Sequence, residues 1–318
     1  MTVTGEKLLE IPYIQDAQVP AQTLDLVLPT RPRTDAPLPR LCIFIHGGAW
    51  RGGDKDEGHP LADALLRADE AHPGVATASI NYRRSPLPDD IAQGKVEPSF
   101  HPNHVHDVHA ALRYLLIDRP ATWKTNDKEP EYDTNNVILT GHSCGAWLVA
   151  AVMLDPGPQN GASIPAHAPL QPSTLRQHIH TYVLLDGIFD IDSLLDEYPS
   201  YAGFIGQAFD APHGEPASVP TQGRYHPVNI QSWVLAGPYA QGAAAPRVAV
   251  VHSRDDDLLT LKQPELARQH LAELISKSGA SVSDFLVCDY DSIKGGHFDL
   301  LKTEAWYDYV RGLFKASP

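Results

Sequence analysis

The chain has 318 residues, with 25 basic and 39 acidic side chains and a formal net charge of −14 at pH 7. Such an acidic protein repels phosphate backbones and anionic lipids, so we expect neither nucleic acid nor a membrane surface as a partner. Hydrophobic residues make up 42% of the sequence, which is enough for a substantial core, but no apolar run reaches the ~20 residues that cross a bilayer.

The cysteines bear on the compartment. Cys42, Cys144 and Cys288 form an odd and sparse set that fits a reducing environment better than a disulfide framework. The N-terminal residues lack the long apolar core and the basic flank of a secretory signal. We therefore expect a cytoplasmic protein. Cys42 and Cys288 fall in predicted strands, and we expect both in the core.

Short β-rich segments alternate with helix-like segments along most of the chain. In chain order, the predicted elements are strands at 25–29, 40–48 and 75–83, a helix at 104–116, a strand at 136–140, a helix at 145–154, strands at 181–189 and 247–253, a helix at 261–279, a strand at 284–290 and a helix at 299–316. This alternation predicts an α/β domain whose central sheet is mostly parallel, with helices on both faces.

Three segments interrupt the alternation. Residues 117–135 and 155–178 are polar and rich in proline, which indicates surface loops. Residues 190–246 lie between two core strands, and their aromatic-rich first part is followed by a proline- and glycine-rich part. We interpret 190–246 as a cap-like insertion that covers the functional site, so that the chain forms a single domain, 1–318.

The sequence GHSCG at 141–145 lies between a predicted strand and a predicted helix. Gly-x-Ser-x-Gly in this context is typical of a nucleophile elbow, in which the glycines let strand and helix approach and the serine takes a strained conformation. Ser143 then stands at the carboxyl end of the sheet and at the positive end of the following helix. We predict that Ser143 is a catalytic nucleophile.

A serine nucleophile needs a base, and the base needs a third group that orients it. In folds with this elbow the order along the chain is serine, acid, histidine. His297 follows the last predicted strand in a loop with two glycines, and Asp255, Asp256 and Asp257 follow the strand before it. We predict His297 as the base and one of these three aspartates as the acid, since only one of them can reach the imidazole.

Acyl transfer also needs hydrogen-bond donors for the oxyanion. The residue after the nucleophile supplies one backbone N–H, here that of Cys144, and the loop after an early strand supplies others. That loop contains a motif of the form HGGxW, which consists of His46, Gly47, Gly48, Ala49 and Trp50. We assign the N–H groups of Gly48, Ala49 and Cys144 to the oxyanion hole.

The histidines at 101, 104, 106 and 109 form a cluster that a metal site would also show. Neither an HExxH pattern nor a cysteine pair accompanies them. We interpret them as surface histidines near the start of a helix, and we predict no metal.

Several of these stretches resemble the hormone-sensitive-lipase-like α/β-hydrolases. They are the motif at 46–50, NYRRSP at 81–86, DVHAALRYL at 107–115 and GHSCG at 141–145. The HGGxW form resembles kynurenine formamidase (arylformamidase), and residues 184–209 and 252–263 look like the fungal type. The resemblance covers roughly residues 10 to 315. It implies the α/β-hydrolase fold, and its acid pattern HSxxDxLL matches Asp256.

The resemblance implies a specific reaction, the hydrolysis of N-formyl-L-kynurenine to L-kynurenine and formate. This step belongs to tryptophan degradation by the kynurenine pathway toward NAD, and it implies an aromatic formamide substrate and no cofactor. A homodimer is compatible with the family. An aryl group needs a flat apolar pocket, for which the candidates are Trp50, Tyr82, Phe189, Tyr198, Tyr201 and Phe204. We select Trp50, Tyr82 and Tyr201 as substrate-binding residues, and Arg51 and Arg83 as candidates for binding the substrate carboxylate.

Two alternative functions remain open. The same machinery with a different pocket makes a carboxylesterase that acts on another small acyl ester. A hydrolase-fold binding protein without catalysis is the second alternative, and the complete set of serine, aspartate and histidine disfavours it.

Overall fold

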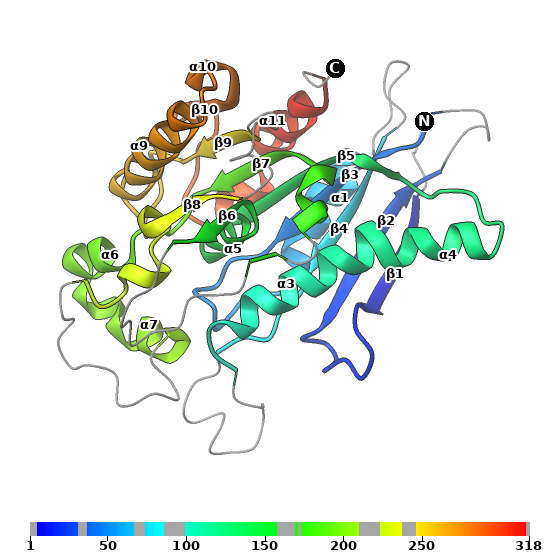
Figure 1. Ribbon diagram of the computed structural model, residues 1–318, viewed down its shortest axis with the longest axis horizontal. Coiled ribbons are helices and arrows are strands. Elements are labelled where there is room, and N and C mark those ends of the chain that lie inside the picture. Colours follow the sequence, from blue (N-terminus) through cyan, green and yellow to red (C-terminus); the bar gives the residue numbers. More distant parts are fainter. Residues whose placement is uncertain are drawn as a thin grey trace.

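An eight-stranded sheet forms the centre of the fold (Figure 1). The structure is a computed structural model that describes residues 5–30, 37–66, 74–85, 99–157, 169–170, 173–209, 223–236 and 246–315. In spatial order the strands are β1 (Gly5–Pro12), β2 (Thr23–Pro29), β4 (Val75–Ile80), β3 (Arg40–Ile45), β5 (Asp133–His142), β7 (Ile179–Leu185), β9 (Arg247–Val251) and β10 (Leu286–Asp289). From β4 to β10 every pair is parallel, while β1 and β2 join the sheet antiparallel. The predicted fold class is confirmed, because a mostly parallel sheet of this order is that of the α/β-hydrolases.

Helices cover both faces of the sheet (Figure 1). α3 (Asn103–Arg113), α5 (Cys144–Met153) and α9 (Lys262–Lys277) contribute to one apolar core, and α1 (His59–Leu65) and α11 (Glu304–Lys315) contribute to the core on the opposite face. All ten residues of α5 are buried, as expected for a helix that is apolar on every side. α5 therefore holds its first residue, which follows Ser143, in a fixed place.

The described residues of the segment 190–246 include the helices α6 (Ile191–Glu197) and α7 (Ala202–Phe209) and the strand β8 (Trp233–Leu235), which pairs with β6 (Leu154–Pro156). Its residues 210–222 and 237–245 lie outside the described residues. Polar contacts tie the segment to the core, because the indole of Trp147 donates to Val228 O at 2.8 Å and Gln263 Oε1 accepts the N–H groups of Phe189 and Asp190. The insertion is thus anchored on both α5 and α9.

Shorter elements complete the described chain. A π-helical turn at Tyr114–Asp118 continues α3 into α4 (Arg119–Thr125), and α10 (Val282–Phe285) precedes β10. Short 3-10 helices lie at Lys55–Gly58, Ser173–His178, Pro199–Tyr201, His226–Val228, Ile230–Ser232 and Asp299–Lys302. The prediction of a loop at 117–135 is therefore wrong for α4. Within the described residues, no helix is both long enough and apolar enough to span a bilayer.

Candidate active site

Ser143 lies at the sharp turn between β5 and α5, with backbone angles of φ 57° and ψ −123°. This left-handed conformation is costly for a residue with a side chain, and the neighbouring elements hold it in place. A Cβ on Gly141 would lie 2.2 Å from Gly145 O, and one on Gly145 would lie 2.3 Å from Ile45 O. Only glycine at both positions lets the strand and the helix approach this closely, which is the physical reason for the Gly-x-Ser-x-Gly pattern.

His297 and Asp256 form a hydrogen-bonded pair near Ser143. His297 Nδ1 lies 2.7 Å from Asp256 Oδ2, and both side chains are almost completely buried. Burial raises the pKa of Asp256, but the contact with His297 and the N–H groups of Leu258 and Leu259 outweigh it, so the pKa lies below its ordinary value. Asp256 is therefore an anion whose negative charge is directed at the imidazole.

The two neighbouring aspartates do not reach the imidazole. Asp257 Oδ1 accepts the backbone N–H of His297 at 2.9 Å, and the exposed Asp255 donates its own N–H to Ser253 Oγ. The backbone carbonyl of His297 in turn accepts the ring Nε2–H of His142 at 2.7 Å. The backbone of His297 is thus held by Asp257 and His142, while its imidazole is held by Asp256.

The loop after β3 has an unusual run of positive φ angles: 96° at Gly48, 52° at Ala49 and 58° at Trp50. Gly48 O accepts the N–H groups of Arg51 and Gly52 at 3.0 and 2.8 Å, which closes a tight turn. Gly48 and Ala49 line the same cleft as Ser143. The first N–H of α5, which belongs to Cys144, has no acceptor within its own helix. The three residues assigned to the oxyanion hole thus lie around the nucleophile.

The thiol of Cys144 faces away from the cleft and is fully buried. Its Sγ accepts the N–H of Trp50 at 3.2 Å and lies 3.5 Å from the hydroxyl oxygen of Tyr82. Burial raises the pKa of this thiol to about 11, so it stays protonated at neutral pH. Cys144 therefore braces the loop after β3 against α5. Of the other two cysteines, Cys42 is buried as expected, whereas Cys288 is exposed on β10, so its placement in the core is wrong.

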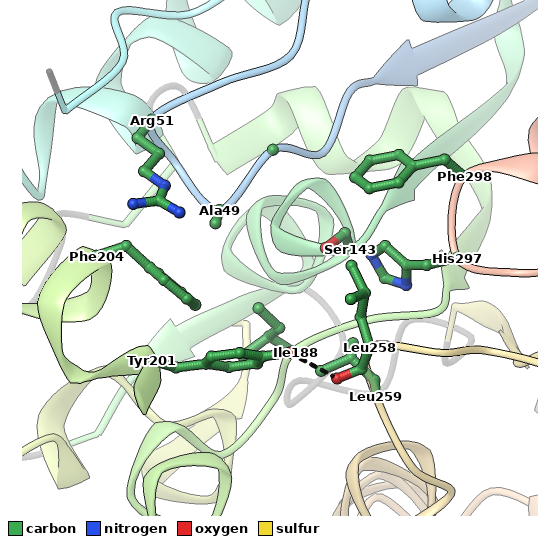
Figure 2. Close-up of a pocket in the computed structure, with 11 residues that line it drawn as sticks. Ala49, Arg51, Ser143, Ile188, Tyr201, Phe204, Leu258, Leu259, His297 and Phe298 are labelled. Carbon is green, nitrogen blue, oxygen red and sulfur yellow. Dashed lines mark hydrogen bonds between the residues drawn. The ribbon is translucent and has the colours of Figure 1, made fainter. Parts of the chain in front are cut away.

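An apolar cleft of about 330 Å³ opens beside Ser143 (Figure 2). The loop after β3, the insertion and the loops that carry Asp256 and His297 each contribute to its wall. The lining residues are Gly48, Ala49, Arg51, Ser143, Ile188, Tyr201, Phe204, Leu258, Leu259, His297 and Phe298. The hydroxyl of Tyr201 donates to Leu258 O at 3.2 Å and so joins the insertion to the acid loop. Phe298, Leu258 and Leu259 are not predicted from the sequence, although each adjoins a predicted catalytic residue or follows it by two or three positions.

The aromatic candidates divide between the cleft and the core. Tyr201 and Phe204 line the cleft, as Figure 2 shows, and Tyr198 stacks on Tyr201. Trp50 and Tyr82, which we select from the sequence for substrate binding, do not line it. Trp50 is 0% exposed and packs against Trp147 and Phe209, and Tyr82 is 1% exposed and stacks on His46; Phe189 is buried as well. These three rings belong to the apolar core instead of the cleft wall.

The two arginine candidates also separate. Arg83 forms a two-point ion pair with the buried Asp107, at 2.8 Å for each nitrogen, and this pairing raises its pKa. Arg51 lies on the cleft wall, with its guanidinium carbon 5.0 Å from the centre of the Phe204 ring. No carboxylate in the described part of the chain pairs with Arg51. Arg51 is thus the cleft cation, and Arg83 is a structural one.

The histidines near the start of α3 are mostly internal, which corrects their interpretation as surface residues. His101, His104 and His109 are buried, and only His106 is exposed. His104 Nε2 lies 2.8 Å from Ser85 Oγ, and His101 packs against aromatic rings. They face the core because α3 buries a wide stripe. The absence of a bound metal stays a prediction.

Metal-ligand atoms do gather in the described residues close to Ser143. Those of His142, Asp186 and His297 lie within 4.8 Å of one another, as do those of Asp186, His252 and Asp256. However, Asp256 and His297 bond each other, and His142 bonds the carbonyl of His297. The bonded atoms of Asp256, His297 and His142 thus hold the acid and the base, while Asp186 Oδ2 and His142 Nδ1 have no hydrogen-bond partner among the described residues.

Solved structures of esterases share this architecture. A truncated carbohydrate esterase from gut microbiota superposes with a TM-score of 0.61 and 20% identity, over 99% of this chain and 96% of that chain. A bacterial heroin esterase superposes with a TM-score of 0.55 and 16% identity, over 99% and 82% of the two chains. At such identities the likeness shows the fold alone.

Sequence relatives include fungal kynurenine formamidases. The one from Meyerozyma guilliermondii is 27% identical over 235 residues, which cover 72% of this chain and 70% of that protein. The one from Saccharomyces cerevisiae is 29% identical over 226 residues, with coverages of 70% and 71%. A kynurenine formamidase-like hydrolase of Fusarium equiseti is 35% identical over 162 residues, or 47% of this chain and 50% of that protein. These are distant homologues.

The sequence model of the BD-FAE family matches residues 24–197, which is more than half of the chain. The matched range runs from β2 through the elbow to the end of α6. Together with the strand order of the sheet, this match shows that the chain belongs to the BD-FAE family of α/β-hydrolases.

Proposed function

We propose that the protein hydrolyses N-formyl-L-kynurenine to L-kynurenine and formate with Ser143, His297 and Asp256 as its catalytic triad. The observation that carries the proposal is the arrangement around one cleft: Ser143 on a strained elbow, and His297 beside it with Nδ1 bonded to Asp256 at 2.7 Å. The distant homology to kynurenine formamidases supports the choice of substrate. No cofactor is required for this chemistry.

The pairing of His297 with Asp256 fixes the ring for base catalysis. Because Nδ1–H donates to Asp256, Nε2 is the nitrogen that carries a lone pair toward Ser143. Ser143 Oγ attacks the formyl carbon while Nε2 takes its proton, and Asp256 stabilises the imidazolium that forms. His297 then gives the proton to the departing aryl amine. A water molecule, activated in the same way, hydrolyses the formyl-serine and releases formate.

The oxyanion develops at the formyl oxygen during both steps. The N–H groups of Gly48, Ala49 and Cys144 are its proposed donors, and each such donor typically contributes about 3–4 kcal/mol in the transition state. The positive φ angles of the loop after β3 fix the directions of its N–H groups. This preorganisation is what makes donors more effective than water.

The cleft suits the rest of this substrate. A formyl group needs little space at the acyl side, and Tyr201, Phe204 and Phe298 offer aromatic surface for the aryl ring. Arg51 offers a charge for the substrate carboxylate, since guanidinium and carboxylate groups can form two parallel hydrogen bonds. Substrate recognition is thus assigned to the insertion, to the loop after β3 and to Phe298, which follows His297.

The deciding experiment is turnover of N-formyl-L-kynurenine by purified protein, followed as kynurenine absorbance, beside p-nitrophenyl acetate and a Ser143→Ala control. Formamide hydrolysis that disappears in the control supports the proposal. Hydrolysis of the ester alone assigns the triad to a carboxylesterase of a different substrate. If neither substrate reacts and a fluorophosphonate probe does not label Ser143, the catalytic proposal is wrong and a binding protein remains.

A further inference from the structure

Asp186 is a buried carboxyl group that the mechanism above does not use. It follows β7, has a left-handed backbone with φ 41°, and is 0% exposed. Its N–H donates to Val251 O at 2.9 Å, and its Oδ1 accepts the N–H of Ser253 at 2.8 Å. Asp186 therefore links the end of β7 to the start of the loop that carries Asp256.

The described residues around Asp186 offer little that would stabilise its negative charge. In the described part of the chain, no lysine or arginine pairs with it, and its Oδ2 accepts no hydrogen bond. The titratable groups that face it are Asp256, His252, His142 and His297. His142 is the last residue of β5, and the other three follow the ends of β9 and β10. His252 Nδ1 lies 3.3 Å from Oδ1, and one carboxylate oxygen of Asp186 lies within 4.8 Å of one of Asp256.

Two adjacent buried carboxyl groups cannot both ionise without a large cost. Asp256 has His297 and two backbone N–H groups to stabilise its charge, whereas Asp186 has one. Burial and the charge of Asp256 raise the pKa of Asp186 to about 9, in spite of the N–H of Ser253, while the pKa of Asp256 is lowered. Burial also lowers the pKa of His252 and His142, which are neutral at pH 7. The carboxyl pair thus carries one negative charge, located on Asp256.

We propose that Asp186 is a neutral carboxylic acid that donates a hydrogen bond from Oδ2 to Asp256 and so positions the triad carboxylate against His297. Asp186 is a positioning residue, and its proton stays between the two carboxyl groups throughout the reaction. The inference rests on the proposed triad but not on the formamide substrate.

This arrangement sets an upper pH limit for the triad. When Asp186 ionises, it loses its donor and places a second negative charge beside the pair of Asp256 and His297. The hydrogen bond that orients Asp256 is then lost. Activity therefore falls as the pH rises through about 9.

The matched variants are Asp186→Asn and Asp186→Ala, assayed as pH profiles of kcat/KM with p-nitrophenyl acetate after subtraction of the Ser143→Ala background. An asparagine reproduces the neutral acid, because its oxygen can accept from Ser253 and its NH₂ can donate to Asp256. We expect Asp186→Asn to stay within about threefold of the wild type at neutral pH and to lose the alkaline fall near pH 9. Asp186→Ala should lose about tenfold or more.

Two results of the kinetic experiment would overturn the proposal. One is a folded Asp186→Asn protein whose activity at neutral pH drops more than about tenfold, since this would show that the negative charge is needed. The other is an alkaline limb that Asp186→Asn leaves unchanged. Infrared difference spectra between wild type and Asp186→Asn give a readout without substrate: a protonated carboxyl band is expected at neutral pH, and its absence would also refute the proposal. These measurements use p-nitrophenyl acetate or no substrate. They therefore still test the role of Asp186 if the protein does not hydrolyse N-formyl-L-kynurenine.

Discussion

Three consecutive aspartates follow β9, and the backbone gives each a different position. Asp256 turns inward to His297 Nδ1, Asp257 accepts the N–H of the same histidine, and Asp255 points to solvent. Hydrogen bonds from Leu258 and Leu259 hold Asp256 in its position. The chemistry of the side chain is thus the same in all three cases, and the turn decides which one can serve as the triad acid.

This division predicts the effects of single amide substitutions. Asp256→Asn removes the charge and favours the wrong tautomer of His297, so kcat should fall on the order of 10³–10⁴-fold. Asp255→Asn is the matched control and should leave kcat unchanged. Steady-state kinetics with p-nitrophenyl acetate measure both. A control that is as damaged as Asp256→Asn would contradict the assignment of the acid.

Arg51 allows a residue-level test of substrate recognition. If it binds the substrate carboxylate, Arg51→Leu should raise KM for N-formyl-L-kynurenine about 10- to 100-fold, because a charge-assisted hydrogen bond contributes about 1.5–3 kcal/mol. Hydrolysis of the uncharged p-nitrophenyl acetate should change little. Arg51→Lys keeps the charge without the two-point geometry, so its KM for N-formyl-L-kynurenine should lie between those of the wild type and Arg51→Leu. An equal loss on both substrates would assign Arg51 to the stability of the loop instead.

At the scale of elements, the site depends on how closely α5 approaches β3 and β5. Gly145 is helical, so alanine there would gain helix propensity, but its Cβ would meet Ile45 O at 2.3 Å. We expect Gly145→Ala to destabilise the fold by about 1–3 kcal/mol. A Cβ on Gly312 in α11 would meet no other atom within 4 Å, and Gly312→Ala should stabilise the fold by about 0.5–1 kcal/mol. Denaturant unfolding of both variants tests the contrast, and a stable Gly145→Ala protein would contradict it.

The apolar periodicity of the sequence predicts the central strands and the long helices, and some elements escape it for physical reasons. β1 is an edge strand without a buried face, so its residues do not form an apolar run. α4 starts with a proline at its second residue, Pro120, where the missing N–H costs nothing, yet a proline in sequence indicates a loop. α6 and α7 are short helices whose environment is set by tertiary contacts with α5 and α9.

The catalytic candidates are easier to predict than the cleft wall. Ser143 and His297 follow from turn residues at strand ends, and such positions depend on the fold alone. Which aromatic ring faces the cleft depends on the direction of each loop, and the residue types alone do not reveal that direction. Tyr201 lines the cleft, for example, whereas Trp50 is buried in the core. Asp186 carries no local motif at all, because its role arises from a carboxyl group brought to it by the neighbouring strand. The cytoplasmic location and the homodimer stay predictions.

At the scale of the whole molecule, buried histidines make stability depend on pH. Burial lowers the pKa of His104 from its ordinary value of 6.5 to about 3, and that of His46 to about 4. The unfolded chain binds protons below pH 6.5 while the folded chain does not, so stability is fully present above this pH and is lost as the pH falls toward 4. His104→Gln keeps a group that can bond Ser85 and should show a shallower acid decline.

Urea unfolding at several pH values measures this decline. His226→Gln is a suitable control, because the side chain of His226 is exposed, and it should retain the slope of the wild type. Equal slopes for His104→Gln and the wild type would contradict the prediction. Asp186 contributes with the opposite sign: its raised pKa gives stability that is present below its ordinary value of 3.8 and is lost as the pH rises toward 9.

The bond from His142 to the carbonyl of His297 joins residues 155 positions apart. On a translating ribosome, the elbow therefore leaves the exit tunnel long before its base does. A nascent chain that has already paired β3 with β5 still lacks the proposed base, His297. We therefore expect hydrolysis only after the loop that carries His297 has docked. In a refolding experiment, the return of activity would thus report when the loop that carries His297 docks on the sheet. It would not report when the elbow of Ser143 forms.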